Sequence, residues 1–200
     1  MLFRNKYRIE TARCPKWDYS SPGYYFVTIV TQDRGHLFGK ILRGEMRFNQ
    51  YGKIVHDEWL RTFEIRSELH RDEFIVMPNH LHGIIRISVV ETRGRASLRE
   101  RRESQCGIAF RAPRSISSFI GGYKSSVTKR INKLRNTPGA RVFQPRFHDR
   151  IIRNEKELFL IRRYIRNNPA NWENDDEFNG DNSKTVKTES PGYVRMPQIH

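Results

Sequence analysis

The amino-acid sequence predicts an α+β protein. We expect a ferredoxin-like or RRM-like antiparallel sheet with helices packed on one face, and an additional C-terminal helix that carries a tyrosine. Two observations lead to this fold class. Segments rich in β-branched and aromatic residues alternate with segments whose apolar residues recur every three or four positions. The resulting order is strand, helix, two strands, helix, strand, with a further helix behind.

The first strand, a hairpin and the first helix come from the N-terminal part of the chain. Residues 24–31 are almost continuously apolar, which is typical of a central strand. Arg43 and Gly44 separate two short extended segments and predict a small hairpin. A helix is predicted over about 53–69, because apolar residues recur there at four-residue intervals. They are Val55, Trp59 and Phe63.

Two strands and a second helix follow. The strands are predicted over 72–78 and 81–88, and the helix runs from Ser115 to about Asn136. Its apolar residues form one stripe: Phe119, Tyr123, Val127, Ile131 and Leu134. No acidic residue occurs within this helix, so its other faces are basic.

The last elements are an extended segment over 142–152 and a third helix. Asn154 is a favourable N-cap for this helix, and two glutamates follow it in the first turn. The helix must end around Asn167 and Asn168, because Pro169 disfavours a helical residue before it.

The domain organisation follows from the distribution of these elements. We expect an irregular lead-in over 1–22, a single domain over 23–172 and an acidic, polar and flexible tail over 173–200. Residues 91–114 hold seven arginines and three glutamates with few large apolar groups, which predicts a loop within the domain.

Composition narrows the class of protein. The net charge is +15, which favours a polyanionic partner, with nucleic acid first, over a protein that is merely basic. Two isolated cysteines argue against a disulfide scaffold or a structural zinc site. No apolar run approaches the ~18 residues of a membrane span, and no secretory signal is recognisable. The sequence therefore predicts a cytoplasmic protein that associates with the nucleoid through DNA.

Positive charge is concentrated in the second half of the chain. Residues 115–166 contain 13 Lys+Arg and three Asp+Glu, and both later helices belong to this block. A phosphate-binding face built from these helices is the better interpretation than evenly spread charge. The candidate phosphate contacts are Arg111, Arg114, Lys124, Lys129 and Arg130.

The most informative motif is His80-Leu81-His82, within a run of strand-forming residues. Side chains two apart in a strand leave the same face, so both imidazoles point the same way. Two neutral imidazoles form half of a divalent-metal site. A pair of surface histidines is the plainer alternative, but the apolar strand and the basic chain favour metal ligands.

Tyr164 and Asn168 are the candidates for the rest of such a site. They lie one turn apart on the third helix and share a face, and an amide oxygen is a suitable ligand for Mg²⁺ or Mn²⁺ beside two imidazoles. Spacing alone slightly favours a core tyrosine and an ordinary helix C-cap. Tyr123 is a second candidate nucleophile, although its apolar stripe indicates the core.

Three ordered motifs carry a family resemblance. They are Pro78-Asn-His-Leu-His-Gly83, Phe143-Gln-Pro-Arg-Phe147, and Ile152-Arg-Asn-Glu-Lys-Glu-Leu158 followed by Arg163-Tyr-Ile-Arg-Asn-Asn-Pro169. Over roughly residues 20–172 the chain resembles the single-tyrosine HUH transposases, most closely the REP-associated tyrosine transposases. The loop over 91–114 has no counterpart in the family pattern.

The resemblance implies a role for each candidate residue. His80 and His82 would bind a divalent metal ion, Tyr164 would be the nucleophile, and Asn168 would be the third ligand where related transposases often use Gln. The implied reaction cleaves and rejoins single-stranded DNA at hairpin or palindromic repeats through a 5′-phosphotyrosine intermediate. The protein would act as a monomer or as a homodimer.

Two other functions fit the same residues. A non-catalytic domain could bind DNA or RNA through its basic helices, with structural histidines. A metal-dependent nuclease could use activated water in place of a tyrosine.

Overall fold

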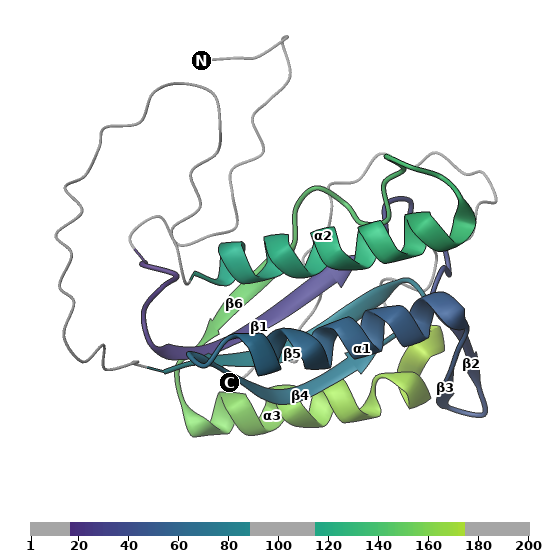
Figure 1. The fold of residues 1–200 in the computed structure, drawn as a ribbon. Helices are drawn as coiled ribbons and strands as arrows, with labels where there is room; N and C mark the ends of the chain where they lie inside the picture. The colour runs from purple at the N-terminus through teal and green to yellow at the C-terminus, as the bar shows by residue number, and fades with distance from the viewer. Residues whose placement is uncertain (1–16, 89–114, 175–200) are drawn as a thin grey trace, which may run out of the picture.

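The computed structural model of the protein describes residues 17–88 and 115–174. Within these residues the chain forms six strands, three α-helices and one 3₁₀ segment (Figure 1). The strands are β1 (Gly23–Val30), β2 (Gly39–Leu42), β3 (Glu45–Phe48), β4 (Leu69–Val76), β5 (His80–Ile87) and β6 (His148–Ile152). The helices are α1 (Gln50–Ile65), α2 (Ile116–Arg135), α3 (Glu155–Asn167) and the 3₁₀ segment η1 (Pro169–Asn174).

Four strands form one antiparallel sheet in the order β4-β5-β1-β6, and β2 and β3 form a separate hairpin. Without this hairpin, the chain follows the predicted order of strand, helix, two strands, helix, strand. The α+β prediction with an antiparallel sheet is therefore confirmed. The register places Thr28 of β1 between His82 of β5 and His148 of β6.

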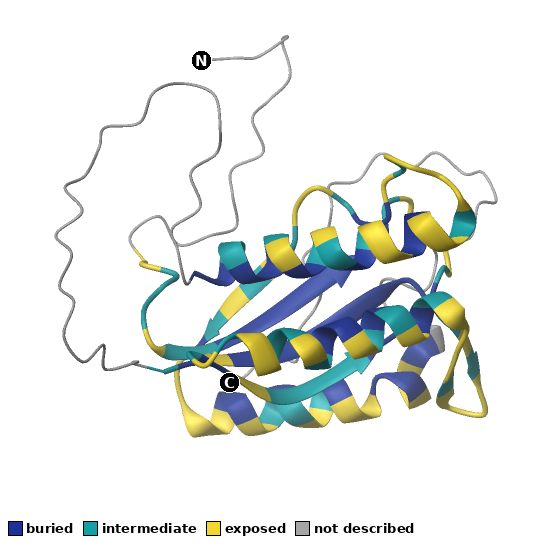
Figure 2. Cartoon of the chain, in the orientation of Figure 1, coloured by how far each residue is buried: buried dark blue, intermediate teal, exposed yellow. Residues whose placement is uncertain are grey.

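The two faces of the sheet are covered by different helices. Helices α1 and α2 pack together on one face, where they enclose the larger core with Trp59 at its centre. Helix α3 packs on the opposite face, where Ile161 and Ile165 contact Phe26 and Ile84. The two central strands, β1 and β5, are the most deeply buried (Figure 2).

Strand β5 serves both faces because its side chains alternate. Leu81 and Ile85 belong to the core under α1 and α2, whereas Ile84 belongs to the core under α3. Gly83 also faces α1, and a Cβ atom built there would lie 2.5 Å from the Trp59 ring. Only a glycine allows the indole to approach the strand this closely.

Element boundaries differ from the sequence prediction in three places: α1, β4 and the segment over 142–152. Helix α1 begins at Gln50, because Asn49 caps it by accepting hydrogen bonds from two backbone N–H groups, and it ends at Ile65 rather than 69. Residues 66–68 form a turn, and β4 begins at Leu69, three residues before its predicted start at 72. The extended segment over 142–152 forms a strand only from His148, apart from one bridge between Phe143 and Thr31.

Several predicted segments lie outside the described residues. These are the arginine-rich loop over 91–114, most of the lead-in over 1–22 and most of the tail over 173–200. The division into one domain with two appendages therefore stays a prediction. Across the described part of the chain, no helix is both long and apolar enough to cross a bilayer.

Candidate active site

His80 and His82 lie side by side beneath α3. Both side chains are fully buried, and their ring centroids are 4.4 Å apart. They occupy the first and third positions of β5, so the alternation of the strand directs them to the α3 face. The sequence predicted this shared direction from the spacing alone.

The tautomer of His80 follows from Asn79. The Asn79 Nδ2 group donates to the backbone carbonyl of Arg34 at 2.9 Å, which orients the amide. Its Oδ1 atom, 2.9 Å from His80 Nδ1, can then only accept, so the His80 proton is on Nδ1. The lone pair is left on Nε2, a buried atom with no hydrogen-bond partner among the described residues.

The charge state of His80 agrees with a ligand role. Burial lowers the pKa of His80 to about 3, and the nearby Arg34 guanidinium acts in the same direction. His80 is therefore neutral at physiological pH, which is the form that binds a metal ion.

His82 is held between a strand and a helix. Its Nδ1 atom lies 2.8 Å from Thr28 Oγ1, and its Nε2 atom lies 3.2 Å from the Tyr164 hydroxyl. With the proton on Nδ1, the ring donates to Thr28 and accepts the Tyr164 hydroxyl on Nε2. In this tautomer both histidines carry their lone pair on Nε2. Phe26 stacks on His82 at 5.3 Å and contacts Tyr164 edge-on.

Tyr164 reaches His82 because α3 is fixed to the sheet. In addition to the apolar contacts of α3, Arg162 forms a bidentate ion pair with Asp72, and Arg166 pairs with Glu73. Both acidic residues lie where the β4 register shifts, between Arg71 and Phe74. The hydrogen bond from Arg162 lowers the pKa of Asp72, so this pair is charged at neutral pH.

Asn168 ends α3 and is buried, with 3% of its surface exposed. The chain continues into η1, since Asn171 N–H donates to the Asn168 carbonyl. Four residues further on, Trp172 packs between His80 and His36, with ring centroids 5.8 and 5.5 Å away. In the sequence, Asn168 thus lies between Tyr164 and Trp172, which contact His82 and His80. Its role as a metal ligand stays a prediction.

The histidine pair suits a metal ion that takes its other ligands from oxygen. In residues 17–88 and 115–174, no group of three or more His, Cys, Asp or Glu side chains is placed to hold a metal ion. An all-imidazole or thiolate site is therefore not formed by these residues. Two imidazole nitrogens with amide, water or phosphate oxygens suit Mn²⁺ or Mg²⁺.

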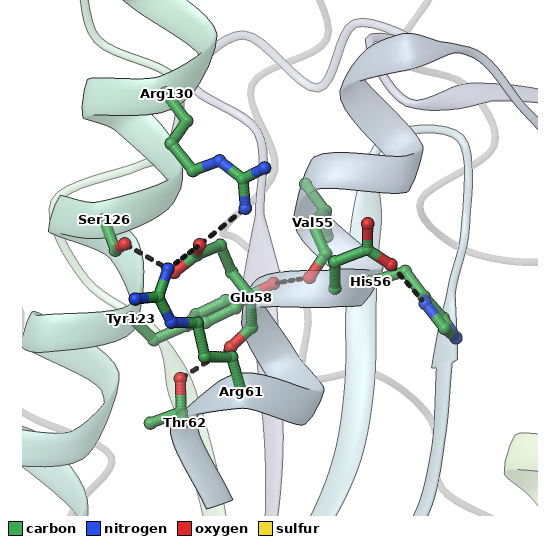
Figure 3. A network of polar contacts seen from close by, with 9 residues as sticks. Val55, His56, Glu58, Arg61, Thr62, Tyr123, Ser126 and Arg130 are labelled. Atoms are coloured by element: carbon green, nitrogen blue, oxygen red, sulfur yellow. Dashed lines mark hydrogen bonds and ion pairs between the residues drawn. The ribbon is translucent and has the colours of Figure 1, made fainter. Parts of the chain in front are cut away.

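The predicted phosphate contacts are dispersed. Arg111 and Arg114 lie outside the described residues. Lys124 donates to the backbone carbonyls of Gln144, Pro145 and Arg146. Arg130 is paired at 2.6 Å with Glu58, which also accepts from Ser126 (Figure 3). Lys129 is exposed. Because α2 and α3 cover opposite faces of the sheet, they do not form one basic surface, and DNA contacts by these residues stay predictions.

Tyr123, the second candidate nucleophile, belongs to the core. It is 1% exposed, and its hydroxyl donates to the Val55 carbonyl (Figure 3). Burial raises the pKa of Tyr123 well above its usual range, with a smaller contribution from Glu58. This environment opposes formation of a phenolate.

The sequence prediction missed the residues that surround the histidines: Thr28, Asn79 and Trp172. Asn79 precedes His80 directly, and its short amide side chain was the available signal. Thr28 could not be found without the β1–β5 register. Trp172 follows Pro169, where the helix prediction ended.

These features define a class: an α+β protein whose sheet presents two buried histidines to a helix-borne tyrosine. No family model matches the chain. An uncharacterized protein of Haemophilus influenzae is 35% identical over 167 residues, which are 82% of this chain and 89% of that protein. The chain therefore belongs to the same family as the Haemophilus protein.

Two solved structures are also similar. A REP-associated tyrosine transposase bound to a REP hairpin has a TM-score of 0.49 at 16% identity, covering 89% of this chain and 95% of that one. A candidate transposase from Deinococcus radiodurans has a TM-score of 0.38 at 14% identity, covering 78% and 95%. The function proposed for the chain rests on the histidine pair and Tyr164.

Proposed function

We propose that the protein is a metal-dependent transesterase of single-stranded DNA. It would cleave and rejoin strands at hairpin or palindromic repeats through a 5′-phosphotyrosine link, and so act in DNA transposition. One observation carries this proposal. The Tyr164 hydroxyl lies 3.2 Å from Nε2 of the buried His82, beside the buried Nε2 of His80, which has no hydrogen-bond partner in the part of the chain that the structure describes.

The Nε2 lone pairs of His80 and His82 would hold the ion, Mg²⁺ or Mn²⁺, with Asn168 as the proposed third ligand. The bound ion would supply Lewis-acid polarisation of the scissile phosphate. Asn79 fixes His80 in the tautomer that this requires, and Thr28 holds the ring of His82 through its Nδ1 atom. A lone pair on His82 can hold the Tyr164 proton or a metal ion, but not both.

Tyr164 would supply the nucleophile. Its oxygen forms a bond to phosphorus, the bond to the 3′ oxygen breaks, the phenol proton is released and the leaving 3′ oxygen takes up a proton from solvent. One phosphoester replaces another, so rejoining needs no nucleotide cofactor. Phe26 and the ion pairs of α3 hold the phenol in place.

Three further observations support the proposal. The strand order β4-β5-β1-β6 agrees with a ferredoxin-like assignment. Tyr164 meets a histidine of its own chain, which supports action in cis. The net charge of +15 suits a DNA partner in the cytoplasm, on the nucleoid.

The test is formation of a covalent adduct. A labelled DNA hairpin with a single-stranded flank is incubated with Mn²⁺ and run on a denaturing protein gel. We expect a protein–DNA adduct that Tyr164→Phe abolishes, a loss on the order of 10⁴-fold or more. Tyr123→Phe is the matched control, because it removes a phenol from the core, and it should retain the adduct.

Each rival predicts a different result. Cleavage without an adduct, retained in Tyr164→Phe, would identify a nuclease that uses water. Binding without cleavage would identify a non-catalytic nucleic-acid-binding domain. Full adduct formation in the double variant His80→Ala, His82→Ala would remove the metal assignment.

A further inference from the structure

A row of three polar side chains crosses the sheet at the candidate site. Thr28 of β1 is opposite both His82 of β5 and His148 of β6, and its hydroxyl oxygen lies 2.8 Å from His82 Nδ1. His82 is buried at one end of this row, whereas His148 is exposed at the other end, on an edge strand. Neighbouring strands are ~4.8 Å apart, so the backbones of the two histidines are separated by roughly 10 Å.

The alternation of side chains along β6 directs His148 to the α3 face. Ile152 packs in the core under α3, and Arg150 forms an ion pair at 2.7 Å with Glu157 of α3. Ile151, which lies between them, packs against the core under α1 and α2. Because side chains two apart in a strand share a face, His148 lies on the α3 face with Arg150 and Ile152.

Helix α3 crosses the sheet diagonally and leaves the start of β6 exposed. Its first turns lie over the end of β6, where Leu158 and Ile152 share one apolar cluster. Its last turns lie over β4, where Arg162 and Arg166 pair with two carboxylates. These carboxylates already neutralise the cations on the β4 side of Tyr164, so a polyanion gains little from that side. The exposed start of β6 lies on the other side.

The chain around His148 is positively charged. Residues 146–153 contain three arginines and one aspartate, and the same alternation places this aspartate, Asp149, on the opposite face. In the described part of the chain the His148 imidazole makes no hydrogen bond or ion pair, whereas the exposed His70 contacts Ser88 at 2.8 Å. An exposed imidazole N–H of this kind can donate to a phosphate oxygen.

We propose that single-stranded DNA enters the site across the start of β6, and that His148 donates a hydrogen bond to its phosphate backbone close to the scissile phosphate. This inference rests on the proposed transesterase function and adds the side from which the substrate approaches. Phosphate contacts position a strand without reading its sequence. The separation of roughly 10 Å between His148 and His82 spans about three nucleotides, at the ~3.4 Å rise of one strand.

The matched variants are His148→Ala and His70→Ala. His70 is an exposed histidine on β4, the other edge strand of the sheet. Leu69, just before it, packs in the core under α1 and α2, so His70 also lies on the α3 face. Both side chains are exposed, so both variants should fold. They differ in the edge of the sheet from which the imidazole is removed.

DNA binding is measured in a Tyr164→Phe background, which blocks the covalent step. The probe is a labelled hairpin with a single-stranded flank, followed by fluorescence anisotropy. We expect His148→Ala to weaken binding ~10-fold or more, the effect of losing a hydrogen bond to a charged group, and His70→Ala to stay within about two-fold. His148→Gln keeps a donor and should recover part of the affinity. Equal binding by His148→Ala and His70→Ala would overturn the proposal.

Neutral phosphate analogues identify the group that His148 contacts. A methylphosphonate replaces one phosphate of the flank at a time, in the same Tyr164→Phe background. At the contacted phosphate, the replacement should weaken binding when His148 is present and have little further effect in His148→Ala. We expect this position within about three nucleotides of the mapped cleavage point. A contacted phosphate farther away, or full additivity at every position, would contradict the proposal.

Metal binding separates a DNA contact from a role at the metal ion. Mn²⁺ affinity without DNA, measured by calorimetry, should be unchanged in His148→Ala. Weaker Mn²⁺ binding would mean that His148 supports the histidine pair and would contradict the proposal. If the unmodified protein forms no adduct at all, the transesterase function fails. If it forms the adduct while the two alanine variants bind DNA equally, only the role of His148 fails.

Discussion

The two faces of the sheet differ in what they bury. The α1/α2 face is closed by aromatic side chains around Trp59, and its buried carboxylate, Glu58, is satisfied by Ser126 and Arg130. The α3 face buries two imidazoles and a threonine, beside a tyrosine that remains half-buried. The α1/α2 face therefore stabilises the fold by burying apolar surface. The α3 face instead buries polar groups, which costs free energy, and this cost is typical of a functional site. Strand β5 contributes to both.

The comparison predicts that the largest loss of stability comes from the α1/α2 face. Trp59→Ala should lower the free energy of unfolding by ~3–5 kcal/mol, because a fully buried indole leaves a cavity. Tyr164→Phe should change it by less than ~1 kcal/mol. Urea unfolding measures both, and a larger loss in Tyr164→Phe would show that α3 is a second structural core.

The buried His80 on the α3 face should make the free energy of unfolding depend on pH. His80 has a folded-state pKa of about 3 against an ordinary value of 6.5, so the unfolded chain binds the proton more tightly. The contribution of His80 is fully present above pH 6.5 and is lost progressively as the pH falls toward 3. In EDTA, His80→Gln should therefore lose less stability than the unmodified protein between pH 6.5 and 4.5. Parallel curves would show that His80 can be protonated in the folded state.

The same threonine-to-valine change on each face of the sheet should affect Mn²⁺ binding differently. Thr28→Val removes the partner of His82 Nδ1 and should weaken Mn²⁺ binding by ~10–100-fold, as expected for a group that orients a ligand. Thr62→Val makes the same change on α1, where the hydroxyl donates to the Glu58 carbonyl. It should leave Mn²⁺ affinity unchanged. If calorimetry gives the same Mn²⁺ affinity for both variants, Thr28 does not contribute to metal binding.

The smallest effect concerns DNA binding by α2. Lys129 is exposed, and if it contacts a phosphate, Lys129→Ala should reduce the slope of log affinity against log salt by ~0.7 for single-stranded DNA. Arg130→Ala should instead lower stability, because Arg130 is the partner of the buried Glu58. Titrations at several salt concentrations measure the slope. An unchanged slope in Lys129→Ala would confine DNA binding to other surfaces.

The sequence was informative where periodicity and local chemistry act alone. The direction of His80 and His82 follows from a period of two, and the cap at Asn154 was correctly placed. The predicted end of α1 was wrong, because helical spacing continues past Ile65, whereas the chain turns at residues 66–68 and pairs in the sheet from Leu69. Tertiary contacts decide such boundaries, and they are not encoded in a short window.

The surroundings of the candidate site depend on long-range pairing. Thr28 meets His82 through the β1–β5 register, and α2 and α3 separate because the sheet lies between them. The sequence gives the positive charge of both helices, but it does not show that α2 and α3 lie on opposite faces of the sheet.

The missing side chain at Gly83 gives the site a rigid backing. The indole of Trp59 rests against the backbone there, immediately after His82. Because this contact is tight, β5 cannot move toward α1 without displacing the indole. An aromatic ring of the opposite core thus supports the strand that carries the histidine pair, and a methyl group added at Gly83 would force either the ring or the strand to shift.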